Sequence, residues 1–147
     1  MELGLCKCKE VKTYMEELTH DAKIAVLRIL NDIVNADNIV KDIEVENMNE
    51  IARSFELADN YMDEVNNLVT LQALSIVRAL SVDLKEKIAQ MMGKMIVIDE
   101  DINYNEVKLY NAVCESCNIE RDFNVEDYPG LTFSGPFANP EDLMNII

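Results

Sequence analysis

The chain of 147 residues is poor in several residue types that common functions require. It has one His, no Trp, four Gly and three Pro, and it has 13 Lys and Arg against 28 Asp and Glu. The single His20 excludes a metal site built on a His pair and leaves a Ser-His-Asp triad without support. The four Gly are scattered and form no phosphate-binding loop. The net charge of −15 disfavours nucleic acid and anionic membranes, because both bind clustered Lys and Arg.

Long apolar runs are absent as well. No segment approaches the ~18 consecutive apolar residues of a membrane span. The first ten residues, MELGLCKCKE, lack the apolar core of a secretory signal. We therefore expect a cytoplasmic protein without membrane insertion, and its acidity favours cations or an electropositive protein partner. The sequence specifies no oligomeric state.

A helical pattern fills most of the chain. Hydrophobic residues make up 49% of it and recur at helical spacing, as at Met48, Ile51, Ala52 and Phe55. Between residues 9 and 118 the one helix breaker is Gly93, and strict strand-like alternation is not convincing anywhere. The pattern predicts an all-α fold, a single helical bundle of six to eight helices.

Capping signals predict where these helices begin and end. Thr19, Asp42, Ser81 and Asn103 are the expected N-caps, and His20 is expected to be exposed near a helix start. The predicted helices cover residues 11–18, 20–36, 43–56, 60–80 (with a possible break at 66–67), 82–98, 104–118 and 140–147. These ranges divide the chain into a lead-in with a short helix (1–20), a helical core (21–119), and a loop-rich C-terminal extension with a short terminal helix (120–147).

The core contains an internal repeat with an offset of 62 residues. Each copy, about 21–57 and 82–119, is an apolar helix, an acidic loop and a second helix. Both loops place an Asp first, a β-branched residue three positions later and a Glu seven positions later. These residues are Asp37, Val40 and Glu44 in the first copy, and Asp99, Ile102 and Glu106 in the second. We expect the β-branched residue to enter the core and the two loops to bring the four acids together.

The repeat resembles the TerB-like tellurite-resistance family, whose pattern is an apolar helix ending in Ala-Asp-Gly, then a β-branched residue, then Glu. The matching residues are Ala36, Asp37, Val40 and Glu44, followed by Asp99, Ile102 and Glu106. The resemblance covers residues 23–119. Asn38 and Glu100 stand where the family usually has Gly; Asn tolerates a left-handed backbone, and Glu is a poorer substitute. The resemblance implies an all-helical fold, a metal site at the acidic loops, and a link to bacterial stress or metal response, with no known reaction.

Two interpretations of the four acids stay open. Asp37, Glu44, Asp99 and Glu106 can serve as helix caps and offset the helix dipoles. They can also bind a divalent cation, and an all-oxygen ligand set favours Ca²⁺, Mg²⁺ or Mn²⁺ over Zn²⁺. The run from Asp99 to Asn103 begins like an EF-hand loop, but Tyr104 and Tyr110 stand where that loop needs Gly and a bidentate Glu. A looser cation loop that uses Asp99, Asp101 and Asn103 is the remaining possibility there.

The four cysteines form two pairs, one at Cys6 and Cys8 and the other at Cys114 and Cys117. Together they could bind zinc. We favour buried structural thiols at Cys114 and Cys117 instead, because both fall on the apolar face of their predicted helix.

The sequence predicts a non-enzymatic, TerB-like accessory protein of stress or metal response that binds a divalent cation through paired acidic loops. The alternative is a helical protein–protein interaction module without a metal site, in which the acids are helix caps. An enzyme has the least support, since no carboxylate pair is marked out as acid and base.

Overall fold

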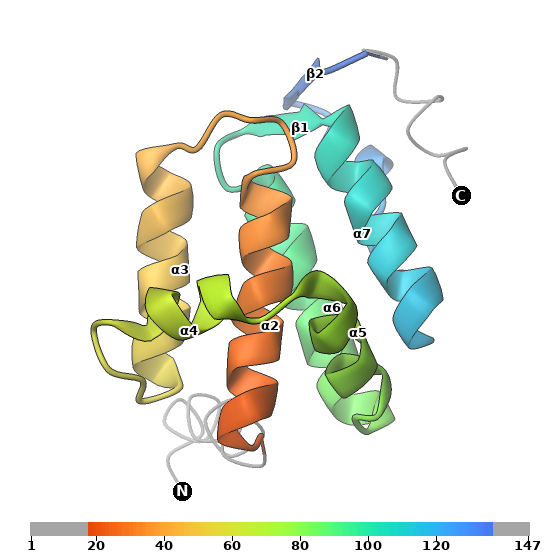
Figure 1. Cartoon of the computed structure of the whole chain (residues 1–147). Helices are drawn as coiled ribbons and strands as arrows, with labels where there is room; N and C mark the ends of the chain where they lie inside the picture. Colours follow the sequence, from red (N-terminus) through yellow and green to blue (C-terminus); the bar gives the residue numbers. More distant parts are fainter. Residues whose placement is uncertain (1–17, 137–147) are drawn as a thin grey trace, which may run out of the picture.

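Helices dominate the computed structural model, which describes residues 18–136 (Figure 1). Within that range lie six α-helices, a 3₁₀ turn and two short strands: α2 (His20–Val34), α3 (Asp42–Ser54), α4 (Tyr61–Asn67), α5 (Thr70–Arg78), α6 (Val82–Val97), β1 (Asp101–Asn103), α7 (Tyr104–Cys117), η1 (Val125–Asp127) and β2 (Thr132–Ser134). The predicted all-α bundle is confirmed. The predicted helix at 140–147, and all but the last residue of the one at 11–18, lie outside the described residues.

The centre of the bundle is α2, which contacts α3, α4, α5, α6 and α7. In Figure 1 this helix, drawn in orange, runs between α3 and α7. Nine of its fifteen residues are buried, because a helix with neighbours on most sides needs an apolar surface wider than a single stripe. Thr19 caps it as predicted, and its Oγ1 accepts a hydrogen bond from the N–H of Ala22 at 3.1 Å. No helix among residues 18–136 has the length and apolar character needed to cross a membrane.

The predicted capping signals are correct at three of four helices. Ser81 Oγ accepts from the N–H of Leu84, and Asn103 Oδ1 accepts from the N–H of Asn105. The prediction that Asp42 caps α3 is wrong, because the N-cap is Lys41. The Lys41 N–H donates to Oε1 of Glu44 at 3.0 Å, which starts the helix one residue earlier. The predicted helix at 60–80 is two helices, α4 and α5, separated by residues 68 and 69.

The 62-residue repeat appears in the backbone itself. The non-glycine residues with positive φ in the described chain form two pairs at that offset: Asn38 with Glu100, and Glu56 with Asn118. The hydrogen bonds that end the second helix of each copy also match at this offset. Leu57 N–H donates to Ala52 O in the first copy, and Ile119 N–H donates to Cys114 O in the second. Left-handed residues are costly outside Gly and Asn, so their recurrence shows that both copies have the same local fold.

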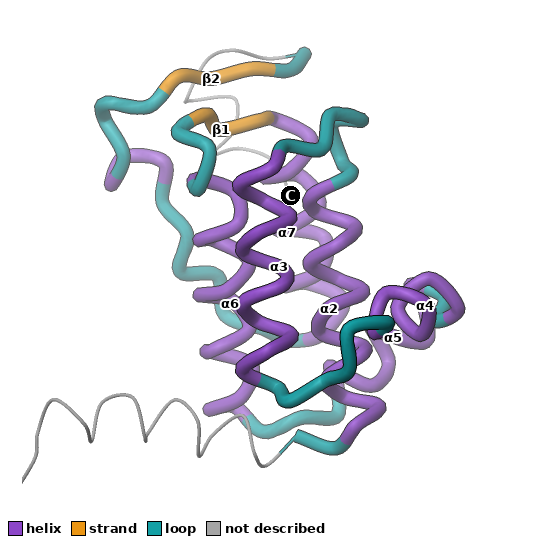
Figure 2. The backbone as a smooth tube through the Cα atoms, turned by 90° about the vertical axis from the view of Figure 1, so that its left-hand side faces the viewer, coloured by secondary structure: helices purple, strands orange, loops and turns teal. Residues whose placement is uncertain are grey.

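The two acidic loops have different surroundings. In the second loop (residues 98–103), β1 pairs in parallel with β2, and Ile102 lies opposite Phe133. Figure 2 shows both strands at the same end of the bundle as the first loop (residues 35–41). Ile102 is fully buried, as predicted, but Val40 is 49% exposed, so the prediction that it enters the core is wrong. Among residues 18–136, a strand pairs with the second loop and none pairs with the first.

Tyr110 anchors the C-terminal extension to the bundle. Its side chain is fully buried. Its hydroxyl accepts hydrogen bonds from the N–H groups of Asp122 and Phe123, at 3.1 and 3.2 Å, and donates to Oδ1 of Asp122. The Phe123 ring packs between those of Tyr110 and Tyr128, with centroids 5.7 and 5.6 Å away. This contact places the segment that leads to β2 beside the second loop.

Ile102 and Val40 hold equivalent positions in the two copies, so a matched pair of substitutions tests whether one is buried and the other exposed. We expect Ile102→Ala to lower the free energy of unfolding by about 2–5 kcal/mol, because it leaves a cavity in the core. The equivalent change in the first copy, Val40→Ala, should cost about 0.5 kcal/mol, because its side chain already faces solvent. Urea unfolding followed by circular dichroism measures both values. Equal losses at the two positions would contradict the description of the first loop.

Candidate acidic site between the two loops

Both loops begin with the same Asp-centred turn. Asp37 Oδ1 accepts a hydrogen bond from the N–H of Ile39 at 2.9 Å, and Asp99 Oδ1 accepts from the N–H of Asp101 at 3.2 Å. The residue after each Asp, Asn38 or Glu100, is left-handed with φ near 60°. Glu100 adopts this conformation although it stands where the resembled family usually has Gly. The second loop therefore keeps the geometry of the first in spite of that substitution.

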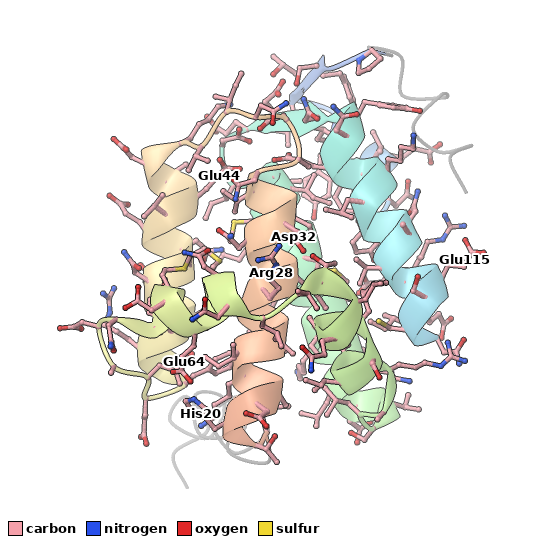
Figure 3. The ribbon with its side chains drawn as sticks, in the orientation of Figure 1. His20, Arg28, Asp32, Glu44, Glu64 and Glu115 are labelled. Carbon is pink, nitrogen blue, oxygen red and sulfur yellow. The ribbon has the colours of Figure 1, made fainter. Side chains whose placement is uncertain are left out.

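Two glutamates enter the interior from these loops. Glu44 lies in the first turn of α3 and Glu106 in the first turn of α7, and each is only 1% exposed. Figure 3 shows Glu44 directed inward from α3 toward α2. We call Glu44 and Glu106 the acidic pair. Asp and Glu are almost never buried to this degree without a partner, so the environment of the pair is unusual for purely structural residues.

The carboxyl groups of the acidic pair lie within hydrogen-bonding reach of each other. Oε1 of Glu44 is occupied by the Lys41 N–H. The Oε2 atoms of both glutamates are buried, and neither has a hydrogen-bond partner among the described residues. Two ionised carboxylates only accept hydrogen bonds, so the pair needs a proton or a cation between them.

Burial and the surrounding negative charges both raise the pKa of the acidic pair. Burial raises the pKa of Glu106 from 4.5 to about 9, and the negative charges of Glu44, Asp37 and Asp99 raise it further. Burial also raises the pKa of Glu44. With its pKa raised to about 9, Glu106 keeps its proton at neutral pH and shares it with the neighbouring Glu44 carboxylate.

All four predicted acids therefore share one neighbourhood. Asp37 and Asp99 lie close enough for their charges to affect both members of the acidic pair. Asp99 is also bound by a base from the other loop, since Lys41 Nζ lies 2.5 Å from its Oδ2. Sequence reasoning missed Lys41, although it is one of two bases among nine acids between residues 37 and 64.

The further candidates Asp101 and Asn103 are directed to β2 instead. Asp101 accepts hydrogen bonds from the hydroxyls of Thr132 and Ser134, at 2.6 and 2.5 Å. Asn103 caps α7 and donates from Nδ2 to Ser134 at 3.1 Å. In the described part of the chain, no three or more His, Cys, Asp or Glu side chains converge in metal-binding geometry. The four acids are neighbours, but they are arranged around a proton-sharing pair and an ion pair.

The remaining predicted residues lie elsewhere. Cys114 and Cys117 are buried on α7, as predicted for structural thiols, and burial raises the pKa of both, that of Cys114 to about 11. Cys6 and Cys8 lie outside the described residues. His20 is the exposed first residue of α2, and its Nε2 lies 2.8 Å from Oε1 of Glu64.

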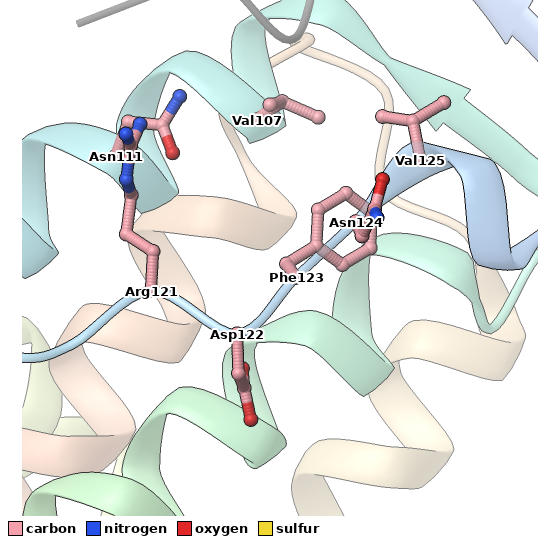
Figure 4. Close-up of a pocket in the computed structure, with 7 residues that line it drawn as sticks. All are labelled: Val107, Asn111, Arg121, Asp122, Phe123, Asn124 and Val125. Atoms are coloured by element: carbon pink, nitrogen blue, oxygen red, sulfur yellow. The ribbon is translucent and has the colours of Figure 1, made fainter.

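A separate pocket of about 350 Å³ opens between α7 and the following segment. Figure 4 shows its lining, which consists of Val107, Asn111, Arg121, Asp122, Phe123, Asn124 and Val125. Asp122 is the one carboxylate among these lining residues, so the pocket holds no carboxylate pair for acid–base chemistry.

Comparison with known proteins supports the fold alone. No protein-family model matches the chain, and no curated protein matches it either. Among solved structures, the chain is similar to the crystal structure of the protein of unknown function PG1108 from Porphyromonas gingivalis W83. The two have 21% sequence identity and a TM-score of 0.62, and the match covers 72% of this chain and 83% of the other.

The acidic pair predicts a characteristic pH dependence of stability. Between pH 4.5 and about 9, the Glu106 carboxyl holds a proton in the folded state that it has lost in the unfolded state. The free energy of unfolding should therefore fall as the pH rises through this window, by up to about 1.4 kcal/mol per pH unit. Glu106→Gln removes the shared proton and provides a permanent donor to Glu44, so its stability should fall less between pH 5 and 8.

Urea unfolding at several pH values, with a chelator present, measures this slope. The control is Glu115→Gln, which changes an exposed acid on the same helix and should keep the wild-type slope (Figure 3). A wild-type slope in Glu106→Gln would show that the acidic pair carries no shared proton.

Proposed function

We propose that the chain is a non-enzymatic, cytoplasmic accessory protein of bacterial stress or metal response, similar to the TerB-like family, that binds a divalent cation at its two acidic loops. One observation carries the proposal: the Glu44 and Glu106 side chains are 1% exposed, and the Oε2 atom of each has no hydrogen-bond partner in the described chain. A cation between them would replace the shared proton and satisfy both oxygens.

The chemistry of the neighbourhood favours a hard cation. The nearby groups are carboxylates from both repeat copies: Asp37 and Glu44 from the first, Asp99 and Glu106 from the second. Ca²⁺, Mg²⁺ and Mn²⁺ prefer such oxygen ligands, whereas zinc favours thiolate and imidazole. A bound divalent ion would offset the repulsion among four acids and fix α3 relative to α7.

The alternative, an interaction module without a metal site, has an observation of its own. Ile39, Val40 and Ile43 are 59%, 49% and 43% exposed at the first loop. Exposed apolar side chains close together are typical of protein contact surfaces. In this case the acids cap helices, the acidic pair keeps its proton, and an electropositive protein partner binds the acidic surface.

Thermal unfolding separates the two functions. After chelator treatment, Ca²⁺, Mg²⁺ or Mn²⁺ is added back at constant ionic strength. A cation present at 100 times its Kd should stabilise the fold by ~2.7 kcal/mol, which raises Tm by roughly 5–10 °C. The interaction module predicts small, equal shifts for every divalent ion.

The double variant Asp37→Asn, Asp99→Asn should lose this response. An amide oxygen still accepts the loop N–H bonds of both Asp residues, so both turns should be retained. Two charges are removed, and Lys41 loses its ion pair with Asp99, so the stability of the variant without added cation is measured first. The matched control is Asp21→Asn, Asp83→Asn, which removes the same charge from exposed first-turn acids of α2 and α6. A full cation response in the Asp37, Asp99 variant would overturn the proposed site.

A further inference from the structure

Residues 39–41 of the first loop hold the positions that β1 holds in the second copy. The residues that precede the two segments, Asn38 and Glu100, have φ of 62° and 64°. The residues that end them are both extended, with φ −105° and ψ 150° at Lys41 and φ −92° and ψ 134° at Asn103. The two segments therefore begin and end with the same backbone geometry.

In the second copy, the C-terminal extension covers this part of the surface. β2 pairs with β1, and Ile102, which lies opposite Phe133, is fully buried. Val107, near the start of α7, lines one pocket with Phe123 and Val125 of the extension and is 3% exposed (Figure 4). The extension thus covers one apolar side chain of the loop and one of the helix that follows it.

The first copy leaves the equivalent side chains in solvent. Val40 and Val45 hold the positions of these two buried residues, and they are 49% and 42% exposed. Ile39 and Ile43 are 59% and 43% exposed. Among residues 18–136, no strand pairs with the first loop. A short extended segment with exposed β-branched side chains and no paired strand is the kind of edge to which another chain adds a strand.

Charge selects among the possible occupants of this surface. Residues 37–50 hold five acids and one base, and the base, Lys41, forms an ion pair with Asp99. A second copy of the chain carries the same net charge of −15, so repulsion opposes self-association through this surface. A segment that alternates apolar side chains with Lys or Arg complements both the exposed β-branched residues and the acids.

We propose that residues 39–45 bind an extended, basic segment of a partner protein, which adds as a strand to residues 39–41 in the way that β2 adds to β1. Its main chain pairs with the first loop, and its apolar side chains cover Ile39 and Val40. Its Lys or Arg side chains face the exposed acids Asp42 and Glu46. The inference does not rest on the proposed cation site and stands if no cation binds.

Selection of phage-displayed random peptides on the full chain tests the proposal. We expect the enriched peptides to alternate apolar residues with Lys or Arg. Fluorescence anisotropy with the most enriched peptide then measures its Kd. The double variant Ile39→Thr, Val40→Thr should raise this Kd about tenfold, because it removes apolar contacts and keeps two exposed β-branched residues. The matched control Val69→Thr, Val82→Thr changes two valines that are 60% and 78% exposed, and its Kd should stay within about twofold of wild type.

Amide hydrogen exchange distinguishes strand addition from contact through side chains alone. With the peptide bound, the amides of residues 39–41 should exchange several-fold more slowly, because main-chain hydrogen bonds protect them. The amides of β1 are the internal reference, since β1 is already paired with β2, and their exchange should not change.

Several outcomes would overturn the proposal: no enriched peptide, enrichment of acidic peptides, an unchanged Kd in Ile39→Thr, Val40→Thr, or unprotected amides at residues 39–41. A wild-type dimer that dissociates in this variant would also overturn it, by assigning the surface to a second copy. Cross-links from residues 39–45 to another segment of the same chain would assign the surface to that segment. The cation response is measured separately by thermal unfolding, so failure here leaves the proposed cation site untouched.

Discussion

Glu44 and Glu106 reach the interior from the first turns of two helices, and there a second unneutralised charge is costly. This cost constrains the whole acidic end of the bundle. α3 and α7 must direct their N-termini toward the same point, where the helix dipoles favour negative charge. Each loop must turn tightly to start its helix at this end of the bundle, and the left-handed residues Asn38 and Glu100 lie in these turns. A proton or a cation at the pair completes the arrangement.

The two copies of the repeat differ in what surrounds their acidic loops. The second loop is paired with β2, and Asp101 is bound by two hydroxyls from the C-terminal extension. The first loop lacks an equivalent strand in the described chain and presents half-exposed Ile39 and Val40. Lys41 of the first loop forms an ion pair with Asp99 of the second. The helices of the two copies therefore match, whereas the two acidic loops differ.

The sequence predicted what local patterns determine. Helical periodicity and capping residues such as Thr19 and Ser81 fix the helices, because those signals act over three or four residues. The repeat predicted that the four acids lie in one neighbourhood. The three-residue strands were missed, since they are too short to show alternation. The ion pair of Lys41 was missed because its partner, Asp99, lies 58 positions away. The exposure of Val40 was missed because the repeat gives it the same position as Ile102, which is buried. The cation and the family resemblance remain predictions.

The hydrogen bonds from the Thr132 and Ser134 hydroxyls to Asp101 also hold the second loop more firmly than the first. Through them and through Tyr110, the second loop, the extension and α7 form one braced unit. The first loop and α3 lack that brace within residues 18–136. We therefore expect a change of shape at the acidic end to fall on the first loop and α3, and the second loop, the extension and α7 to keep their arrangement.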